Sequence, residues 1–309
     1  MARGPAKFTQ KKDECIYCGI RDVKLTDEHI VPFSLGGTHV IKNAICSKCA
    51  DITKNFEQRV ARDLWGDARN AFDAPTRRPK ERDRFIKITD PNTGKKLKFP
   101  KHIYPAGLVF YKMGKAGILL GLPENFDISK YWKMVVINDD KRMEEFHKKY
   151  PGKLILKFRH IPQEFGQLLA KIAYGQILTQ LESDDFDPII LPYILGNKKN
   201  VSWVVGGCPN DQKPEPSNGY NISTVVFGDR DRVLLIALIR LYANTHAPAY
   251  HAIVGQVKGR YKVEAVLEKL GPGTFSFIDN DKHSEGTQMN DHWVPKIWPN
   301  IWLDRIGSR

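Results

Sequence analysis

The stretch CIYCGIRDVKLTDEHIVPFSLGGTHVIKNAICSKC, residues 15–49, begins and ends with a pair of cysteines separated by two residues. Such a spacer lets both sulfurs of one turn point at the same ion, and two such turns complete a closed tetrahedral zinc site. Two disulfides or a redox pair are the alternatives. Structural disulfides are rare in the reducing cytosol, where we expect this chain, and a redox motif would not need the second pair of cysteines. The sequence therefore predicts a structural Zn²⁺ held by Cys15, Cys18, Cys46 and Cys49.

The residues between and after the cysteine pairs predict two strands and a helix. Residues 24–31 and 39–45 have the pattern of strands, and residues 32–37, which contain one proline and two glycines, predict the loop between them. After the last cysteine of the pairs, apolar residues recur at every fourth position, which indicates one buried helix face. They are Ile52, Phe56, Val60, Leu64 and Ala68. A zinc ion would join the start of the first strand to the start of this helix.

These pieces together resemble one known family. The segments CIYCG and DEHIVP, the pair Gly36-Gly37, and CSKC at the start of a helix are similar to the four-cysteine, zinc-stabilised branch of the HNH (ββα-metal) endonucleases. The resemblance covers about residues 13–70. It implies a ββα-metal fold and hydrolysis of phosphodiester bonds in nucleic acid with one catalytic divalent ion, Mg²⁺ or Mn²⁺.

The resemblance also implies roles for two neighbouring residues. His29 matches the general base that takes a proton from the attacking water, and Glu28 matches a ligand of the catalytic ion. Imidazole titrates near neutral pH, and a carboxylate is a hard ligand that suits Mg²⁺. Neighbouring strand residues point to opposite faces, so both can serve one site only where the strand bends, for which Pro32 and the two glycines are plausible causes. The alternative is that both are exposed strand residues.

The sequence departs from the family at two other positions. Where the family usually has a middle Asn and a final His or Asn, this chain has Ile41 and Ala50. Thr53 and Glu57 share the helix face of Ala50, and we expect Glu57 to be the second ligand of the catalytic ion. His39 is another candidate for a ligand or phosphate contact, or a solvated strand residue. If nothing substitutes, the site would bind DNA without cutting it.

The net charge of +13 is unevenly distributed. Residues 1–150 carry 30 Lys and Arg against 19 Asp and Glu, which accounts for +11 and suggests an anionic partner such as nucleic acid. Residues 76–101 hold ten basic and three acidic residues and read as a linker followed by a hairpin. Lysines that alternate with aromatic residues there suit a phosphate backbone. A solvated edge hairpin protected by lysines is the alternative.

The remaining sequence predicts a mixed α+β domain. We expect strands at 108–111 and 118–120, strands at 134–137 and 154–158 around a helix at 140–150, and an amphipathic helix at 162–181. Four further segments predict an antiparallel set. They are residues 201–205, 224–227, 234–242 and 249–257.

The predicted fold class is therefore α+β. We expect a zinc-bound ββα-metal module at residues 1–75, a basic linker and hairpin at 76–105, and an α+β domain at 106–309. The last of these would serve recognition or regulation and ends in a Trp-rich tail.

The expected function is a metal-dependent HNH endonuclease that cuts double-stranded DNA, in restriction or anti-phage defence. Residues 1–12 lack the apolar core of a secretory signal, and the longest apolar stretch, residues 233–239, is shorter than the roughly 20 residues that span a bilayer. We therefore expect a cytoplasmic protein without membrane contact, with a homo-oligomer or protein partner possible through the C-terminal domain. One competing hypothesis is a non-catalytic, zinc-finger-type DNA-binding protein. Another is that the zinc module is only structural and that the activity of the protein lies in the C-terminal domain.

Overall fold

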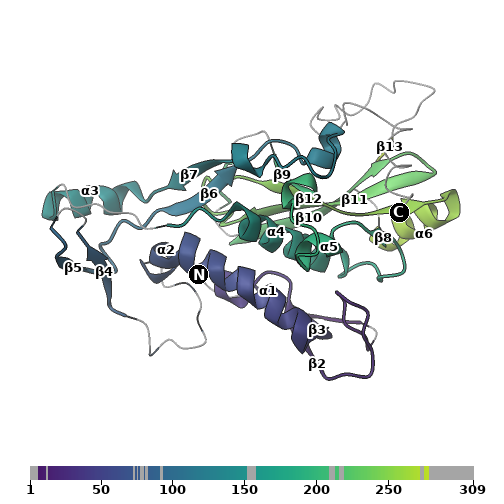
Figure 1. The fold of residues 1–309 in the computed structure, drawn as a ribbon, viewed down its shortest axis with the longest axis horizontal. Coiled ribbons are helices and arrows are strands. Elements are labelled where there is room, and N and C mark those ends of the chain that lie inside the picture. The colour runs from purple at the N-terminus through teal and green to yellow at the C-terminus, as the bar shows by residue number, and fades with distance from the viewer. Residues whose placement is uncertain are drawn as a thin grey trace.

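The computed structural model describes most of the chain, and the N-terminal module is its first part (Figure 1). The described residues are 6–11, 13–71, 74, 76, 80, 83–90, 93–151, 158–208, 213–215, 219–271 and 275–277, the last three as backbone. The module consists of β1 (Lys7–Gln10), β2 (Leu25–His29), β3 (His39–Cys46) and α1 (Ser47–Arg59). Both predicted strands and the helix are confirmed, whereas β1, which pairs in parallel with β3 to give the order β1-β3-β2, was not expected.

The helix that follows the zinc motif changes its winding in the middle. After α1, residues Val60–Leu64 form a π-helical turn, closed by a hydrogen bond from Trp65 N to the Val60 carbonyl, and α2 (Gly66–Ala71) continues the chain. An α-helix has 3.6 residues per turn, so side chains spaced by four residues rotate gradually away from one face. A π turn contains more residues, so it brings the following side chains back toward that face. The apolar positions from Phe56 onward are thereby all buried, as the sequence predicted.

The C-terminal part is built around one antiparallel sheet. Its strand order is β13-β10-β11-β12-β8, with β9 also paired to β12 and β13 parallel to β10. The strands are β8 (Asp187–Pro188), β9 (Val205–Gly207), β10 (Tyr220–Gly228), β11 (Arg232–Leu241), β12 (Tyr250–Lys258) and β13 (Phe275–Phe277). The predicted antiparallel set is confirmed in β10, β11 and β12, while most of the predicted strand 201–205 is a 3-10 turn. The short helix α5 (Leu191–Ile194) and helix α6 (Arg260–Leu270) complete this part.

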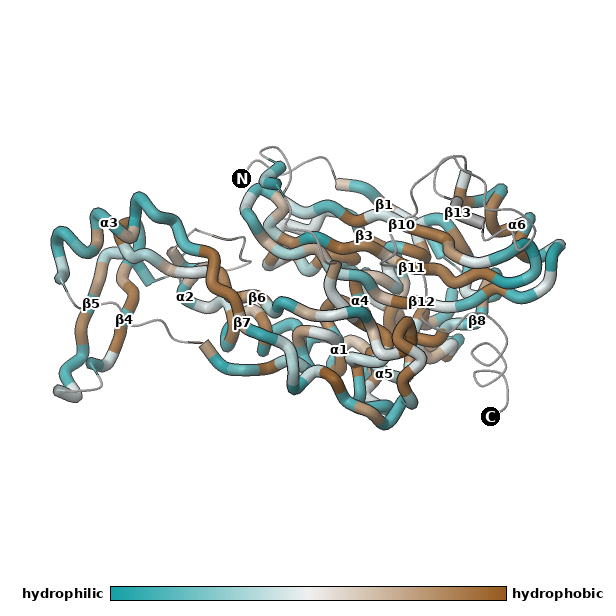
Figure 2. Tube along the Cα trace, turned by 90° about the horizontal axis from the view of Figure 1, so that it is seen from above, coloured by the Kyte–Doolittle hydropathy of each residue, from teal (hydrophilic) through white to brown (hydrophobic). Residues whose placement is uncertain are grey.

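Helix α4 (Pro162–Ile177) lies between the N-terminal module and this sheet. It packs against α1 on one side and against β10, β11 and β12 on the other, as the views in Figures 1 and 2 show. It starts with a proline at its first position, which suits a helix N-terminus, and ends four residues before the predicted residue 181. A helix that is apolar on all sides is buried, and α4 is buried from Phe165 to Gly175 except at Gln167.

A second group of elements extends to one end of the long axis (Figures 1 and 2). Strands β4 and β5 form the predicted basic hairpin, β6 pairs with β7, and α3 follows. Their bounds are β4 (Phe85–Thr89), β5 (Lys96–Pro100), β6 (Leu108–Lys112), β7 (Lys133–Ile137) and α3 (Asp140–Lys149). The inward face of the hairpin packs on α3, where the ring centroids of Phe99 and Phe146 are 5.1 Å apart.

One predicted strand pair is wrong, and some predictions cannot be compared. Residues Gly117–Leu120 form a 3-10 turn that ends at Gly121 with φ 67°, so β6 pairs with β7 and not with 118–120. Its Ile118 and Leu119 are fully buried, and a short apolar run of this kind does not distinguish strand from turn. Most of the predicted strand 154–158 and the Trp-rich tail lie outside the described residues.

The hydrophobic core joins the N-terminal and C-terminal parts. One cluster of buried side chains runs from Cys15 in the zinc motif to Val266 in α6, and a smaller one lies around Leu234 and Ile253. The mixed helix and strand content with an N-terminal ββα module confirms the predicted fold class. No helix among the described residues is long and apolar enough to cross a bilayer.

The loop after β2 depends on a close backbone approach at Gly37. A Cβ at this position would lie 1.8 Å from the carbonyl oxygen of Val31. We expect Gly37→Ala to lower the free energy of unfolding by about 1–3 kcal/mol, because the loop must shift to relieve the overlap. Denaturant unfolding measures the change.

The matched control is Gly66→Ala at the first position of α2. An added Cβ there meets nothing within 4 Å, so stability should be unchanged or raised by about 0.5–1 kcal/mol. Equal losses in the two variants would contradict the role of the close approach.

Candidate metal centre and active site

The four predicted zinc ligands come together at one corner of the N-terminal module. Cys15 and Cys18 belong to a turn in which Gly19 N donates to the Cys15 carbonyl at 2.8 Å, with Gly19 at φ 69°. Cys46 ends β3, and Cys49 lies in the first turn of α1. The four sulfurs all lie within 4.8 Å of one another.

The spacing of these sulfurs fits a zinc ion. Zn–S bonds of about 2.3 Å in a tetrahedron place sulfurs about 3.8 Å apart, and the Sγ atoms of Cys18 and Cys46 are 3.8 Å apart. Burial and the neighbouring sulfurs raise the pKa of the Cys49 thiol far above its ordinary value, which a bound cation would reverse. Within the described residues, this is the one group of three or more His, Cys, Asp or Glu side chains placed to hold an ion. The cluster could therefore hold the structural zinc.

Strand β2 carries Glu28 and His29 just after a bulge. The register against β3 shifts between Thr26 and Glu28, where three residues of β3 lie opposite the single residue Asp27. In this bulge Asn43 has φ 47°, and its N–H donates to Asp27 Oδ1 at 3.2 Å. The extra residues lie in β3, so this bulge bends and twists β3 opposite Asp27.

Glu28 and Glu57 meet around the ammonium group of Lys171, which belongs to α4. The Lys171 Nζ lies 3.0 Å from Oε1 of Glu28 and 3.0 Å from Oε1 of Glu57. It also donates to the carbonyl oxygens of His29 and Ile30. The Lys171 side chain is 1% exposed, against 13% for Glu28 and 24% for Glu57, so solvent reaches the cluster through the carboxylates.

The electrostatics of this cluster hold Lys171 in its charged form. Burial alone lowers the pKa of the ammonium, but Glu28 and Glu57 outweigh it and raise the pKa above its ordinary value. Tyr17, inside the CIYCG motif, donates its hydroxyl to Glu28 Oε1 at 3.0 Å. Burial, and then the Glu28 charge, raise the pKa of Tyr17 well above its ordinary value, so that it stays a donor. Oε1 of Glu28 therefore accepts from both Tyr17 and Lys171.

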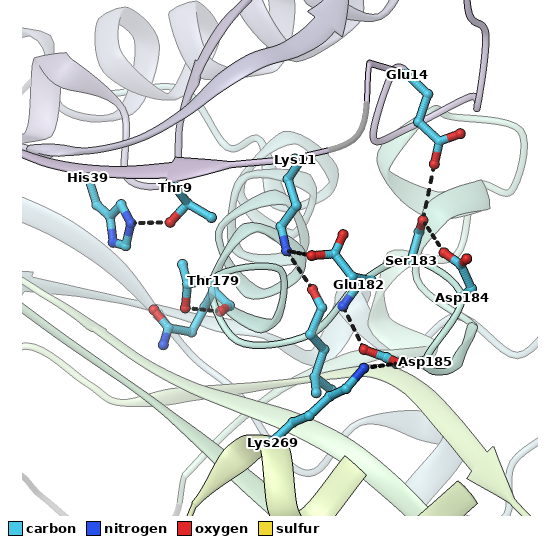
Figure 3. Close-up of polar contacts among 12 residues, drawn as sticks. Thr9, Lys11, Glu14, His39, Thr179, Glu182, Ser183, Asp184, Asp185 and Lys269 are labelled. Carbon is cyan, nitrogen blue, oxygen red and sulfur yellow. Dashed lines mark hydrogen bonds and ion pairs between the residues drawn. The ribbon is translucent and has the colours of Figure 1, made fainter. Parts of the chain in front are cut away.

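The other candidate ligands make contacts elsewhere. The Thr53 hydroxyl donates to the Ala50 carbonyl of its own helix at 3.2 Å. His39 Nε2 lies 2.7 Å from Thr9 Oγ1 on β1, as Figure 3 shows, and its burial lowers the pKa of the imidazole. Ile41 is fully buried, in the core of the module. Of the candidates for the second ligand, Glu57 is the one that contacts the Lys171 ammonium, which also pairs with Glu28.

A second set of polar contacts ties the module to the loop after α4 (Figure 3). Lys11, which follows β1, donates to the Leu181 carbonyl at 2.8 Å and pairs with Glu182 at 2.9 Å. The Ser183 hydroxyl donates to Glu14 at 3.2 Å. These contacts fix the segment that leads into the first cysteine pair.

The comparison with known families locates the same segment. Residues 15–64 match the family model described as HNH endonuclease. This segment is therefore similar to the HNH endonucleases, and the part of the chain around it is called the HNH module for this similarity. It contains the four cysteines, Glu28, His29 and Glu57, and it indicates nuclease activity on nucleic acid. No curated protein and no solved structure matches the chain.

Sequence reasoning missed two residues that contact the HNH site. Lys171 lies in the run LLAKIAYG, where a single charge among apolar residues indicates a buried cation that needs a partner. Tyr17 lies between the first two cysteines, and no pattern in the sequence points it at Glu28. The sequence does not identify the partners of Lys171 either, because Glu28 and Glu57 both lie more than a hundred residues before it.

The cysteine cluster makes a direct prediction about metal content. We expect one Zn²⁺ per chain, and we expect Cys49→Ser to lose it and to unfold the HNH module, because structural zinc contributes folding free energy. Elemental analysis and circular dichroism measure both. Cys208→Ser, which changes a cysteine outside the cluster, should keep its zinc, and full zinc retention in Cys49→Ser would contradict the assignment.

Proposed function

We propose that this chain is a metal-dependent endonuclease that hydrolyses phosphodiester bonds in double-stranded DNA. His29 would be the general base, and Glu28 and Glu57 would be ligands of a divalent ion, Mg²⁺ or Mn²⁺. The observation that supports this proposal is the convergence of the Glu28 and Glu57 carboxylates, both within residues 15–64, on one ammonium group that also binds the backbone carbonyl of His29. Carboxylate oxygens are the ligands these hard ions prefer. The ion would stabilise negative charge that develops on the phosphate.

The position of His29 suits a base that must be held still. Its imidazole is half-buried and packs edge-on against the ring of Phe33, with centroids 6.0 Å apart. Its own carbonyl accepts from Lys171, and the N–H of Ile30 donates to the His39 carbonyl at 3.1 Å. Both contacts fix the peptide group that joins His29 to Ile30. A neutral imidazole there could accept a proton from water.

The surface we propose for the nucleic-acid backbone is the outward face of the β4–β5 hairpin. Lys87 and Lys98 lie directly opposite each other, Lys96 lies opposite Thr89, and all three lysines are exposed. Like charges directly opposite each other destabilise a sheet, and phosphate groups across the pair would relieve this repulsion. Lys87 also pairs with Asp83 at 2.7 Å, but exposed pairs of this kind contribute little.

The biological setting that we propose is restriction or anti-phage defence in the cytoplasm, and it follows from the family resemblance. The C-terminal domain would supply target recognition, a subunit contact or regulation. The alternative function is a non-catalytic DNA-binding protein with a degenerate nuclease site. What favours it is that Ile41 and Ala50 occupy the positions where the family usually has Asn and His or Asn.

Plasmid nicking tests the proposed chemistry. We expect the wild-type protein to cut with Mg²⁺ or Mn²⁺ and to stop with EDTA, and we expect His29→Ala to reduce the rate by at least about a hundredfold, as loss of a general base does. His39→Ala is the matched control, because His39 contacts Thr9 on β1, and should retain cleavage. DNA binding without cleavage in any metal would favour the non-catalytic alternative.

The hairpin surface makes a separate prediction about DNA binding. We expect Lys87→Glu and Lys98→Glu each to weaken binding to all sequences alike, and each lost phosphate contact to reduce the slope of log K against log salt by about one. Fluorescence anisotropy at several salt concentrations measures both. Lys262→Glu, an equally exposed lysine on α6, is the control, and an equal effect there would show that total charge matters and not this face.

A further inference from the structure

We propose that Lys171 is a built-in cation of the nuclease site, supplied by the C-terminal part of the chain, which positions both carboxylates and weakens their hold on a free divalent ion. This inference rests on the proposed function, because it assigns Glu28 and Glu57 to the catalytic ion. It adds a positioning residue outside residues 15–64, the segment that matches the HNH family.

The contacts of the ammonium fill its hydrogen-bonding capacity. A lysine has three N–H donors, and four oxygens surround Nζ, from Glu28, Glu57 and the carbonyls of His29 and Ile30. Two of these acceptors are the predicted metal ligands, and a third belongs to the predicted base. One side chain therefore contacts both carboxylates and the backbone of the proposed base.

The packing around α4 holds this ammonium in place. The Lys171 side chain is 1% exposed and lies on the side of α4 that packs against the HNH module. One turn later, a Cβ at Gly175 would lie 3.4 Å from the side chain of Ile30, so helix and module approach closely there. Arg59 of α1 and Glu164 of α4 form an additional ion pair between the same two helices. These contacts keep α4 and the module together around the buried ammonium.

The charge of the cluster determines how strongly it attracts metal ions. Two carboxylates and one ammonium sum to −1, whereas the carboxylates alone would sum to −2. A divalent ion on Glu28 and Glu57 would lie close to the ammonium and be repelled by it, since both cations share the same two carboxylates. Lys171 therefore lowers the affinity of the free protein for the ion while it holds the ligands in position.

Direct binding of Mn²⁺ to the zinc-loaded protein tests this proposal, with isothermal titration as the readout. We expect Lys171→Met to bind Mn²⁺ at least about tenfold more tightly than wild type, because a buried positive charge near the ion is removed. In plasmid nicking, the same variant should have a kcat at least about tenfold lower with little change in KM, because the carboxylates and His29 lose a common anchor.

Arg240→Met is the matched control. Arg240 is also a buried cation of the C-terminal part, paired with Glu215 at 3.1 Å and bonded to the carbonyls of Thr245 and Ala247. Its loss should lower the melting temperature and leave the Mn²⁺ affinity unchanged. A folded Lys171→Met protein with unchanged or weaker Mn²⁺ affinity would overturn the proposal.

A second background keeps the test valid if Lys171→Met does not fold. In Glu57→Gln, one of the two carboxylates is already neutral, so removing Lys171 leaves less unpaired charge. Lys171→Met must still raise the Mn²⁺ affinity relative to Glu57→Gln alone, and equal affinities would overturn the proposal. If wild type never cuts but Mn²⁺ affinity depends on Lys171, the proposed function fails, and the effect of Lys171 on metal binding by Glu28 and Glu57 stands without a catalytic role. If cleavage requires His29 but Lys171→Met leaves the Mn²⁺ affinity unchanged, this inference fails and the proposed function stands.

Discussion

The burial of one ammonium group between two carboxylates constrains the whole arrangement of this protein. Lys171 is almost completely buried, and a buried charge is tolerated only where paired groups neutralise it. Its partners are Glu28 on β2 and Glu57 on α1, so α4 must keep one position relative to two elements that lie more than a hundred residues before it. A shift of α4 would leave a charge unpaired in the core. The geometry of the HNH site and the packing of the C-terminal sheet are therefore linked through one helix.

Two other features stabilise the interface between the HNH module and α4. The cysteine cluster connects the turn before β2 to the start of α1, so it determines where Glu57 stands relative to the strand that carries Glu28. The contacts of Lys11 and Glu14 with the loop after α4 fix the chain that enters the first cysteine pair. The continuous hydrophobic core then fills the space between module and sheet. The HNH module thus shares its interior with the C-terminal part.

The sequence predicted local features well and long-range partners poorly. The cysteine spacing, the two strands and the helix depend on periodicity within a few residues. Counting along one helix face pointed to Glu57, whose role as a metal ligand stays a prediction. The contact between Glu28 and Glu57, however, passes through Lys171, which no local pattern connects to them. The same limit applies to β1, whose pairing with β3 depends on residues some thirty positions apart. Ile118 and Leu119 gave the wrong strand because they are buried in a turn, where an apolar run has no distinguishing period.

The distribution of charge over the molecule follows from these constraints. The interior of the HNH site carries a net charge of −1 from Glu28, Glu57 and Lys171, although residues 1–150 carry +11 in total. A phosphate near the carboxylates would be repelled by them, and a second cation in the site reverses this repulsion. Under the proposed function, attraction of the nucleic-acid backbone would therefore come from basic groups outside the site, such as those of the β4–β5 hairpin. On this argument, the positive charge of the N-terminal half would bring the proposed substrate to the protein, and the site would become attractive to phosphate after the ion had bound.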